Sequence, residues 1–135
     1  MKPVIQTRTG ATGNCFEACI ASILELKLEE VPDFSAYSED QTWVKKLNKW
    51  LSKRGLVYFE VNIDVSCTND FFKSRNFYHI LIGDTVGGGK LKHAVVGNNG
   101  KMVYDPHPSN IGIIKEKILT MGLFVYTGKK GVICA

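Results

Sequence analysis

The sequence predicts an α+β fold in which N-terminal helices pack on a mostly antiparallel C-terminal sheet. The segments with apolar residues at helical spacing lie before Gly55, and the β-branched and aromatic runs follow it. This order is typical of α+β domains, because parallel α/β folds alternate helices with strands. The chain has 135 residues, 44% of them hydrophobic, so we expect one domain, residues 1–135, with one core.

The first helix is expected from about Cys15 to Leu26. The segment before it, residues 1–7, should be extended. Asn14 is the expected N-cap, because a side-chain oxygen there can accept one of the free backbone N–H groups. One further turn at residues 28–31 should be stopped by Pro32.

A second, amphipathic helix is predicted over residues 41–54, with Gly55 as the residue that ends it. Its apolar positions are Trp43, Leu47, Trp50 and Leu51, and we expect both tryptophans in the core. Its basic residues are Lys45, Lys46, Lys49, Lys53 and Arg54. We interpret them as a solvated helix face, because no aromatic-plus-basic motif for nucleic acid accompanies them.

The chain after Gly55 is rich in β-branched and aromatic residues and is predicted to form strands. The segments are 56–63, 76–83, 92–97, 101–105 and 123–127. Residues 112–119 fit either a short helix or a strand. The glycine-rich loop 84–90 lacks the Gly-Lys-Ser/Thr ending of a phosphate cradle.

Cys15 is the candidate nucleophile, because it opens a helix directly after a glycine-rich lead. Unpaired N–H groups and the positive end of the helix dipole favour a thiolate there, and they can also hold an oxyanion. We therefore expect the pKa of Cys15 to lie well below that of a free cysteine. The alternative is a small buried residue at a helix start, which is common for cysteine.

A nucleophilic thiol needs a base, and His93 is the best placed of the three histidines. A type I turn at Asn98–Asn99 with a bulge at Gly100 would pair residue 97 with 101 and His93 with Asp105 on one face. The acid could then hold the imidazole in the needed tautomer. A two-residue turn at Asn99–Gly100 would instead point the two side chains to opposite faces.

The ordered Cys, His and Asp resemble the papain-like cysteine peptidases. The pattern is a Gln, a Gly-Asn-Cys-x-x-Ala-Cys-x-Ala-x-x-Leu helix start, a His-Ala-Val-Val strand and a Tyr-Asp-Pro strand end, within residues 6–109. The nearest branch contains the bacteriocin leader-processing (double-glycine) peptidases, and small phage and bacterial proteins carry a similar Asp-Pro-His-Pro-Ser segment. The resemblance implies a papain-like fold with Cys15 as nucleophile, His93 as general base and then acid, and Asp105 as the orienting residue.

The resemblance also implies an oxyanion-hole Gln before the nucleophile. Gln6 is the candidate, although it lies nine residues before Cys15, three more than in the family. An insertion in the glycine-rich lead would absorb the difference, and Asn14 is the alternative donor. His107, held between two prolines, could line the cleft and contact substrate or could simply end the strand rigidly. His79 is expected in the core.

The remaining cysteines carry no motif. Cys19 is expected to be a buried helix residue, and Cys67 and Cys134 have no assigned role. Cys15 and Cys19 with a histidine could bind zinc, but no second cysteine pair at ligand spacing supports a metal site. We expect no metal and no cofactor.

The predicted function is a cysteine-dependent hydrolase of the peptidase or amidase type, acting through a thioester acyl-enzyme on a peptide or protein. Acyl transfer to an amine with the same triad is an alternative, and so is a non-catalytic, phage-type binding protein on this scaffold. The net charge of +4 is mild, and no partner nucleic acid or membrane is expected. No secretory signal is visible, so we expect a cytoplasmic location, in the bacterial host if the protein is phage-encoded.

Overall fold

The computed structural model describes residues 1–34, 42–63 and 76–128. Within them lie the helices α1 (Cys15–Leu24) and α2 (Thr42–Ser52) and the 3₁₀ turns η1 (Gly10–Thr12) and η2 (Leu28–Glu30). The strands are β1 (Leu56–Asn62), β2 (Tyr78–Thr85), β3 (Lys92–Asn98), β4 (Lys101–Tyr104) and β5 (Ile113–Tyr126). The predicted α+β class is confirmed. Cys67 and Cys134 lie outside the described residues.

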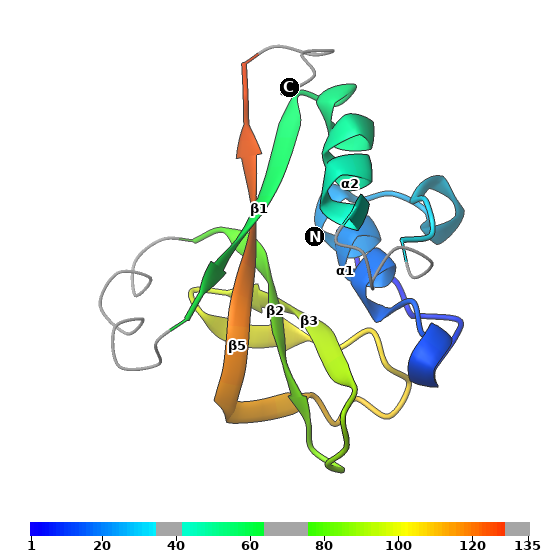
Figure 1. The fold of residues 1–135 in the computed structure, drawn as a ribbon, viewed down its shortest axis with the longest axis vertical. Coiled ribbons are helices and arrows are strands. Elements are labelled where there is room, and N and C mark those ends of the chain that lie inside the picture. Colours follow the sequence, from blue (N-terminus) through cyan, green and yellow to red (C-terminus); the bar gives the residue numbers. More distant parts are fainter. Residues whose placement is uncertain (35–41, 64–75, 129–135) are drawn as a thin grey trace.

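The five strands form one antiparallel sheet in the order β1-β5-β2-β3-β4. Both helices lie on the same side of it, α1 against β3 and β2 and α2 against β1 (Figure 1). The arrangement follows from strand alternation, since successive side chains of a strand point to opposite faces. On β2, Ile80 belongs to the cluster that packs against the helices, whereas Leu81 packs with Val95 and Met121.

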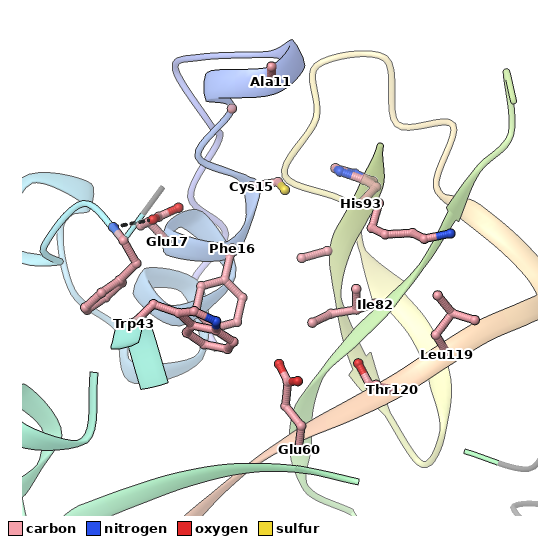
Figure 2. Close-up of a pocket in the computed structure, with 14 residues that line it drawn as sticks. Ala11, Cys15, Phe16, Glu17, Trp43, Glu60, Ile82, His93, Leu119 and Thr120 are labelled. Atoms are coloured by element: carbon pink, nitrogen blue, oxygen red, sulfur yellow. Dashed lines mark hydrogen bonds between the residues drawn. The ribbon is translucent and has the colours of Figure 1, made fainter. Parts of the chain in front are cut away.

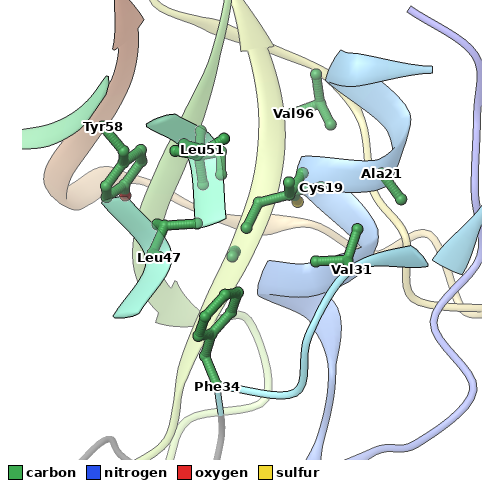
Figure 3. Packing of buried hydrophobic residues seen from close by; sticks show 11 residues of the cluster. Cys19, Ala21, Val31, Phe34, Leu47, Leu51, Tyr58 and Val96 are labelled. Atoms are coloured by element: carbon green, nitrogen blue, oxygen red, sulfur yellow. The ribbon is translucent and has the colours of Figure 1, made fainter. Parts of the chain in front are cut away.

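The core between the helices and the sheet is built from mostly small residues on α1, together with Ile20, and from leucines on α2. Cys19, Ile20 and Ala21 of α1 are fully buried, as are Leu47 and Leu51 of α2 (Figure 3). The small α1 side chains let this helix lie close to β3. Cys19 is therefore the buried helix residue that was predicted.

α1 begins at Cys15 as predicted but ends at Leu24 rather than Leu26. Glu25 adopts a left-handed conformation with φ of 57°, which closes the helix. The predicted further turn is present as η2. α2 is confirmed within the described residues, and Gly55 follows it with φ of 69°. Lys45, Lys46 and Lys49 of α2 are exposed, and so is Lys53 just after it. Arg54, also beyond the end of α2, is half-buried, and its guanidinium lies 4.2 Å from the Trp50 ring centre.

Residues 112–119, for which the sequence allowed either a helix or a strand, form a strand. Together with the predicted strand 123–127 they make up one long strand, β5. Gly122 lies within this strand, and the Tyr58 ring packs directly against it in the space that a side chain would take. A Cβ atom at Gly122 would come within 2.2 Å of the Tyr58 hydroxyl. Tyr58 itself is 1% exposed and donates its hydroxyl proton to Glu60 at 2.8 Å.

Candidate active site

Cys15 lies where two hollows in the surface meet. Its side chain is half-buried at the first position of α1. Figure 2 shows its sulfur pointing toward His93. Cys15 and His93 both line a hollow of about 500 Å³, here named the Trp43 pocket, and a second of about 450 Å³, here named the Gln6 pocket. A substrate chain laid along both would pass directly over the thiol.

The protonation state predicted for Cys15 is wrong. Burial raises the pKa of the thiol above its ordinary value, and the negative charge of Glu17 adds to the rise. The backbone N–H groups of Ala94, Phe16 and Cys15 lower this pKa but do not reverse the effect. Desolvation of the thiolate therefore outweighs the helix N-terminus that the prediction relied on.

His93 and Asp105 form a buried hydrogen-bonded pair. His93 Nε2 lies 2.6 Å from Asp105 Oδ1, and the two residues are 9% and 3% exposed. The carboxylate also accepts the backbone N–H of His107 at Oδ1 and that of Gly112 at Oδ2, both at 2.8 Å. Because a carboxylate only accepts, the proton of a neutral His93 imidazole resides on Nε2, and Nδ1 carries the lone pair.

The register that was predicted to bring this pair together is wrong. Asn99 and Gly100 have φ of 53° and 74°, so they form the two-residue turn that was the alternative. Gly97 consequently pairs with Met102 rather than with Lys101. Taken alone, this register would point His93 and Asp105 to opposite faces.

A bulge inside the strand restores the contact. Val96 pairs with Tyr104 while Gly97 pairs with Met102, so Val103 is an extra residue on β4. The extra residue reverses the alternation of side chains beyond it and turns Asp105 to the side of His93. The predicted contact is thus confirmed by a different backbone route.

Gln6 lines the same pocket as Cys15 and His93 and is 5% exposed. Its Nε2 donates to the carbonyl of Arg8 at 2.7 Å, and its backbone N–H donates to Pro106 O at 3.0 Å. The η1 turn takes up the three additional residues before Cys15. The loop also closes on itself, because the Asn14 N–H donates to Arg8 O at 3.3 Å. The chain therefore returns Gln6 to the side of the cleft.

Asn14 is the N-cap residue of α1, as predicted, but its side chain points away from the helix N–H groups. Its Oδ1 accepts the backbone N–H groups of Thr7 and Arg8 at 3.0 Å, and it makes no side-chain cap bond to α1. Its Nδ2 donates to Thr7 Oγ1 at 3.0 Å. Its side chain lines a separate hollow that includes neither Cys15 nor His93. Asn14 holds the segment before α1 in place. Gln6 is the candidate side-chain oxyanion donor that lines the pocket of Cys15 and His93.

His107 lines the Gln6 pocket, as one of its two predicted roles required. Its ring is edge-on to that of His93, with centres 5.9 Å apart. Its Nδ1 accepts the backbone N–H of Ser109 at 3.1 Å and lies 2.7 Å from the Ser109 hydroxyl. The imidazole is therefore fixed at the rim by its own turn.

Sequence reasoning missed the residues of the Trp43 pocket. Trp43, predicted as core, packs edge-on to Phe16 at 5.3 Å and lines this pocket. Glu17 is 4% exposed and accepts the Phe34 N–H at 2.8 Å. Glu60 carries no sequence signal, because it is one charge within a strand. A glutamate between Phe16 and Ala18 on a helix of small residues was the available signal for Glu17.

The third histidine, His79, is confirmed as a core residue. It is 0% exposed, its Nδ1 lies 3.2 Å from the Phe77 carbonyl oxygen, and burial lowers its pKa. In the described part of the chain, no group of three or more His, Cys, Asp or Glu side chains is arranged to hold a metal ion. No helix in the same residues is long and apolar enough to span a membrane.

Comparison of the chain with protein-family models, with curated proteins and with solved structures finds no match.

Proposed function

We propose that this chain is a papain-like cysteine hydrolase that cleaves an amide, ester or isopeptide bond in a peptide or protein. The observation that carries the proposal is the buried 2.6 Å contact between His93 and Asp105, next to a cysteine that opens a helix. The open surface on both sides of Cys15 supports it, because a carbonyl group can then reach the sulfur.

In the first half of the reaction, Cys15 Sγ attacks the carbonyl carbon while its proton moves to Nδ1 of His93. The carbonyl electron pair moves to the oxygen, which the N–H of Cys15 and the amide of Gln6 stabilise. The intermediate collapses, the bond to the leaving amine or alcohol breaks, and His93 returns the proton to the leaving group. A thioester on Cys15 remains.

In the second half, His93 takes a proton from water, and the hydroxide equivalent attacks the thioester carbon. The carbon–sulfur bond breaks, the acid product leaves, and Cys15 regains its proton. Asp105 remains a carboxylate throughout, keeps the proton of neutral His93 on Nε2 and stabilises the imidazolium that forms at each step.

The raised pKa of Cys15 defines how this mechanism starts. A resting thiol must lose its proton during the attack, so His93 acts as a general base rather than as one half of a stored ion pair. A stored thiolate–imidazolium pair would instead require the buried Cys15 sulfur to stay charged, at the cost of its desolvation.

Two alternatives use the same residues. Acyl transfer replaces water with an amine in the second half, and the two-sided access to Cys15 would admit one. A non-catalytic binding protein would use the two pockets to hold a partner without cleaving it. The raised pKa of Cys15 is the observation that favours this alternative.

Alkylation of Cys15 by iodoacetamide, followed by peptide mapping from pH 6 to pH 10, tests the proposal. We expect Cys15 to be modified near neutral pH and His93→Gln to confine its labelling to alkaline pH. Incubation with a peptide library and with activated esters should give products from the native protein and none from Cys15→Ala. Identical Cys15 labelling profiles in the native protein and in His93→Gln would refute a general-base role. Products that contain an added amine would indicate transfer.

A further inference from the structure

We infer that the Trp43 pocket selects a substrate side chain with an aliphatic stem and a cationic end, such as lysine, next to the bond that is cleaved. This inference rests on the proposed function for its meaning as substrate selection. Its structural basis is one feature: the aromatic pocket that begins at Cys15 has the Glu60 carboxylate at its far side (Figure 2).

The walls of the Trp43 pocket suit a methylene chain. Phe16 and Trp43 form one side and Ile82 another, so an alkyl stem entering from Cys15 would be covered by apolar surface. The indole face of Trp43 also attracts a cation that lies over it. The pocket therefore accommodates a lysine-like stem along its length and favours a charge at its end.

Glu60 supplies the counter-charge. Figure 2 shows its carboxylate pointing into the pocket toward Trp43. Its Oε1 accepts the hydroxyl proton of Tyr58 at 2.8 Å, which fixes the carboxylate, and no described lysine or arginine pairs with it. The bond from Tyr58 positions one oxygen and leaves the other toward the pocket.

The other charged groups of the pocket do not cancel this preference. Glu17 adds a carboxyl group of the same sign, already bonded to the Phe34 N–H. Lys92 is the one lysine or arginine among the described residues that line the pocket, and its ammonium pairs with Asp84 on the neighbouring strand. The unshared charge at the pocket is therefore negative, and a cationic side chain matches it.

The test uses chloroacetamides that carry an alkyl tail of three to six carbons, ending either in an ammonium group or in a methyl group. Each reagent alkylates Cys15: the carbon–sulfur bond forms, chloride leaves, and the thiol proton passes to His93. The tail is part of the probe itself, so the test does not depend on which side of the scissile bond the pocket serves. Iodoacetamide, which has no tail, reports the reactivity of the thiol alone.

We expect the ammonium tail of best length to react roughly three- to tenfold faster than its methyl partner at low salt, a range typical of a partly exposed charge pair. High salt should reduce the ratio. Glu60→Gln should abolish the preference, because glutamine keeps an acceptor for Tyr58 but carries no charge. Glu116→Gln, which removes the same charge from an exposed site on β5, should retain it.

Two results would overturn the inference: equal or faster reaction of the methyl tail, or a preference that survives Glu60→Gln. A failure of the proposed function would look different. Cys15 would then react with iodoacetamide independently of His93, whatever the preference between tails.

Discussion

His79 and His93 occupy related positions in the sheet and have different surroundings. Each pairs with a glycine on the neighbouring strand, His79 with Gly97 and His93 with Gly83. The His79 ring covers its glycine, since a Cβ atom at Gly97 would come within 2.6 Å of Nε2. At Gly83 the same atom would meet the carbonyl of Lys117 at 2.8 Å, and His93 instead reaches Asp105.

The comparison shows what separates a structural histidine from a candidate base. Both imidazoles are more than nine-tenths buried, so burial does not distinguish them. His93 has a nitrogen held by a buried carboxylate and lies between two open pockets, whereas the described contacts of His79 are with the Phe77 carbonyl and ring. A partner that fixes the tautomer and access to a substrate together mark the functional residue.

The largest expected difference between the two histidines is the effect of removing each imidazole in turn. His93→Ala should lower turnover by about 10⁴-fold, because general acid–base transfer contributes up to that amount. His79→Leu should leave turnover within about threefold of the native value, since His79 lines neither pocket. Hydrolysis of an activated ester under conditions where both variants are folded measures the difference, and a comparable loss in both would contradict the distinction.

Removing the Asp105 carboxylate tests what the partner of His93 contributes. Asp105→Asn should reduce turnover roughly 10²- to 10³-fold, less than the loss of about 10⁴-fold at a serine triad, because a thiol is the better nucleophile. The variant should also lose about 1–3 kcal/mol of stability. The Asp105 carboxylate is contacted by three N–H groups, those of His93, His107 and Gly112, and the N–H₂ group of an asparagine would have to face at least one of these donors. Denaturant unfolding and kinetics, measured on the same sample, separate the two effects. Full activity would show that Cys15 and His93 act as a dyad.

The β4 bulge offers a subtler change at the same pair. Deleting Val103 should turn Asp105 away from His93 and reduce turnover by a factor no larger than that of Asp105→Asn. Gly100→Val is the matched control in the same hairpin. It should cost about 1–2 kcal/mol of stability, because a β-branched residue is placed at positive φ. It should change turnover far less than the deletion. Equal turnover in the two variants would mean that the bulge does not orient Asp105.

The smallest expected effect concerns acid stability. Burial lowers the pKa of His79 below its ordinary 6.5, so under more acidic conditions the unfolded chain binds a proton that the folded chain does not. Its stabilising contribution is therefore complete above pH 6.5 and is lost as the pH falls below that value. His79→Leu should flatten the decline in unfolding free energy between pH 7 and pH 5. Urea titrations at these pH values check it, and an unchanged slope would assign the decline to other groups.

The sequence predicted more of the reacting residues than of their surroundings. The place of Cys15 at a helix start followed from its glycine-rich lead, and the contact between His93 and Asp105 was predicted, although from a turn that the structure does not have. The bulge at Val103 did not, because nothing in Lys101–Tyr104 distinguishes a continuous strand from a bulged one. The rise in the pKa of Cys15 was missed because it depends on burial by residues distant in sequence.

The Trp43 pocket was hidden for the same reason. Trp43 belongs to α2, Glu60 to β1 and Ile82 to β2, and only the sheet order places them together. Helical spacing correctly indicated that Trp43 faces inward, yet it could not show that a hollow lies beside the ring. The long β5 was ambiguous in its first half because Ile113, Ile114 and Ile118 suit both kinds of structure.

The place of β5 in the sheet also bears on how the protein is made. β5 is the last described strand in the chain but the second in the sheet, and β1 pairs with no other described strand. While the chain emerges from a ribosome, α1 can dock on β2 and β3 as soon as these are complete, whereas β1 must wait for β5. We therefore expect Cys15, His93 and Asp105 to come together in the newly made chain before Glu60 reaches its place beside Trp43.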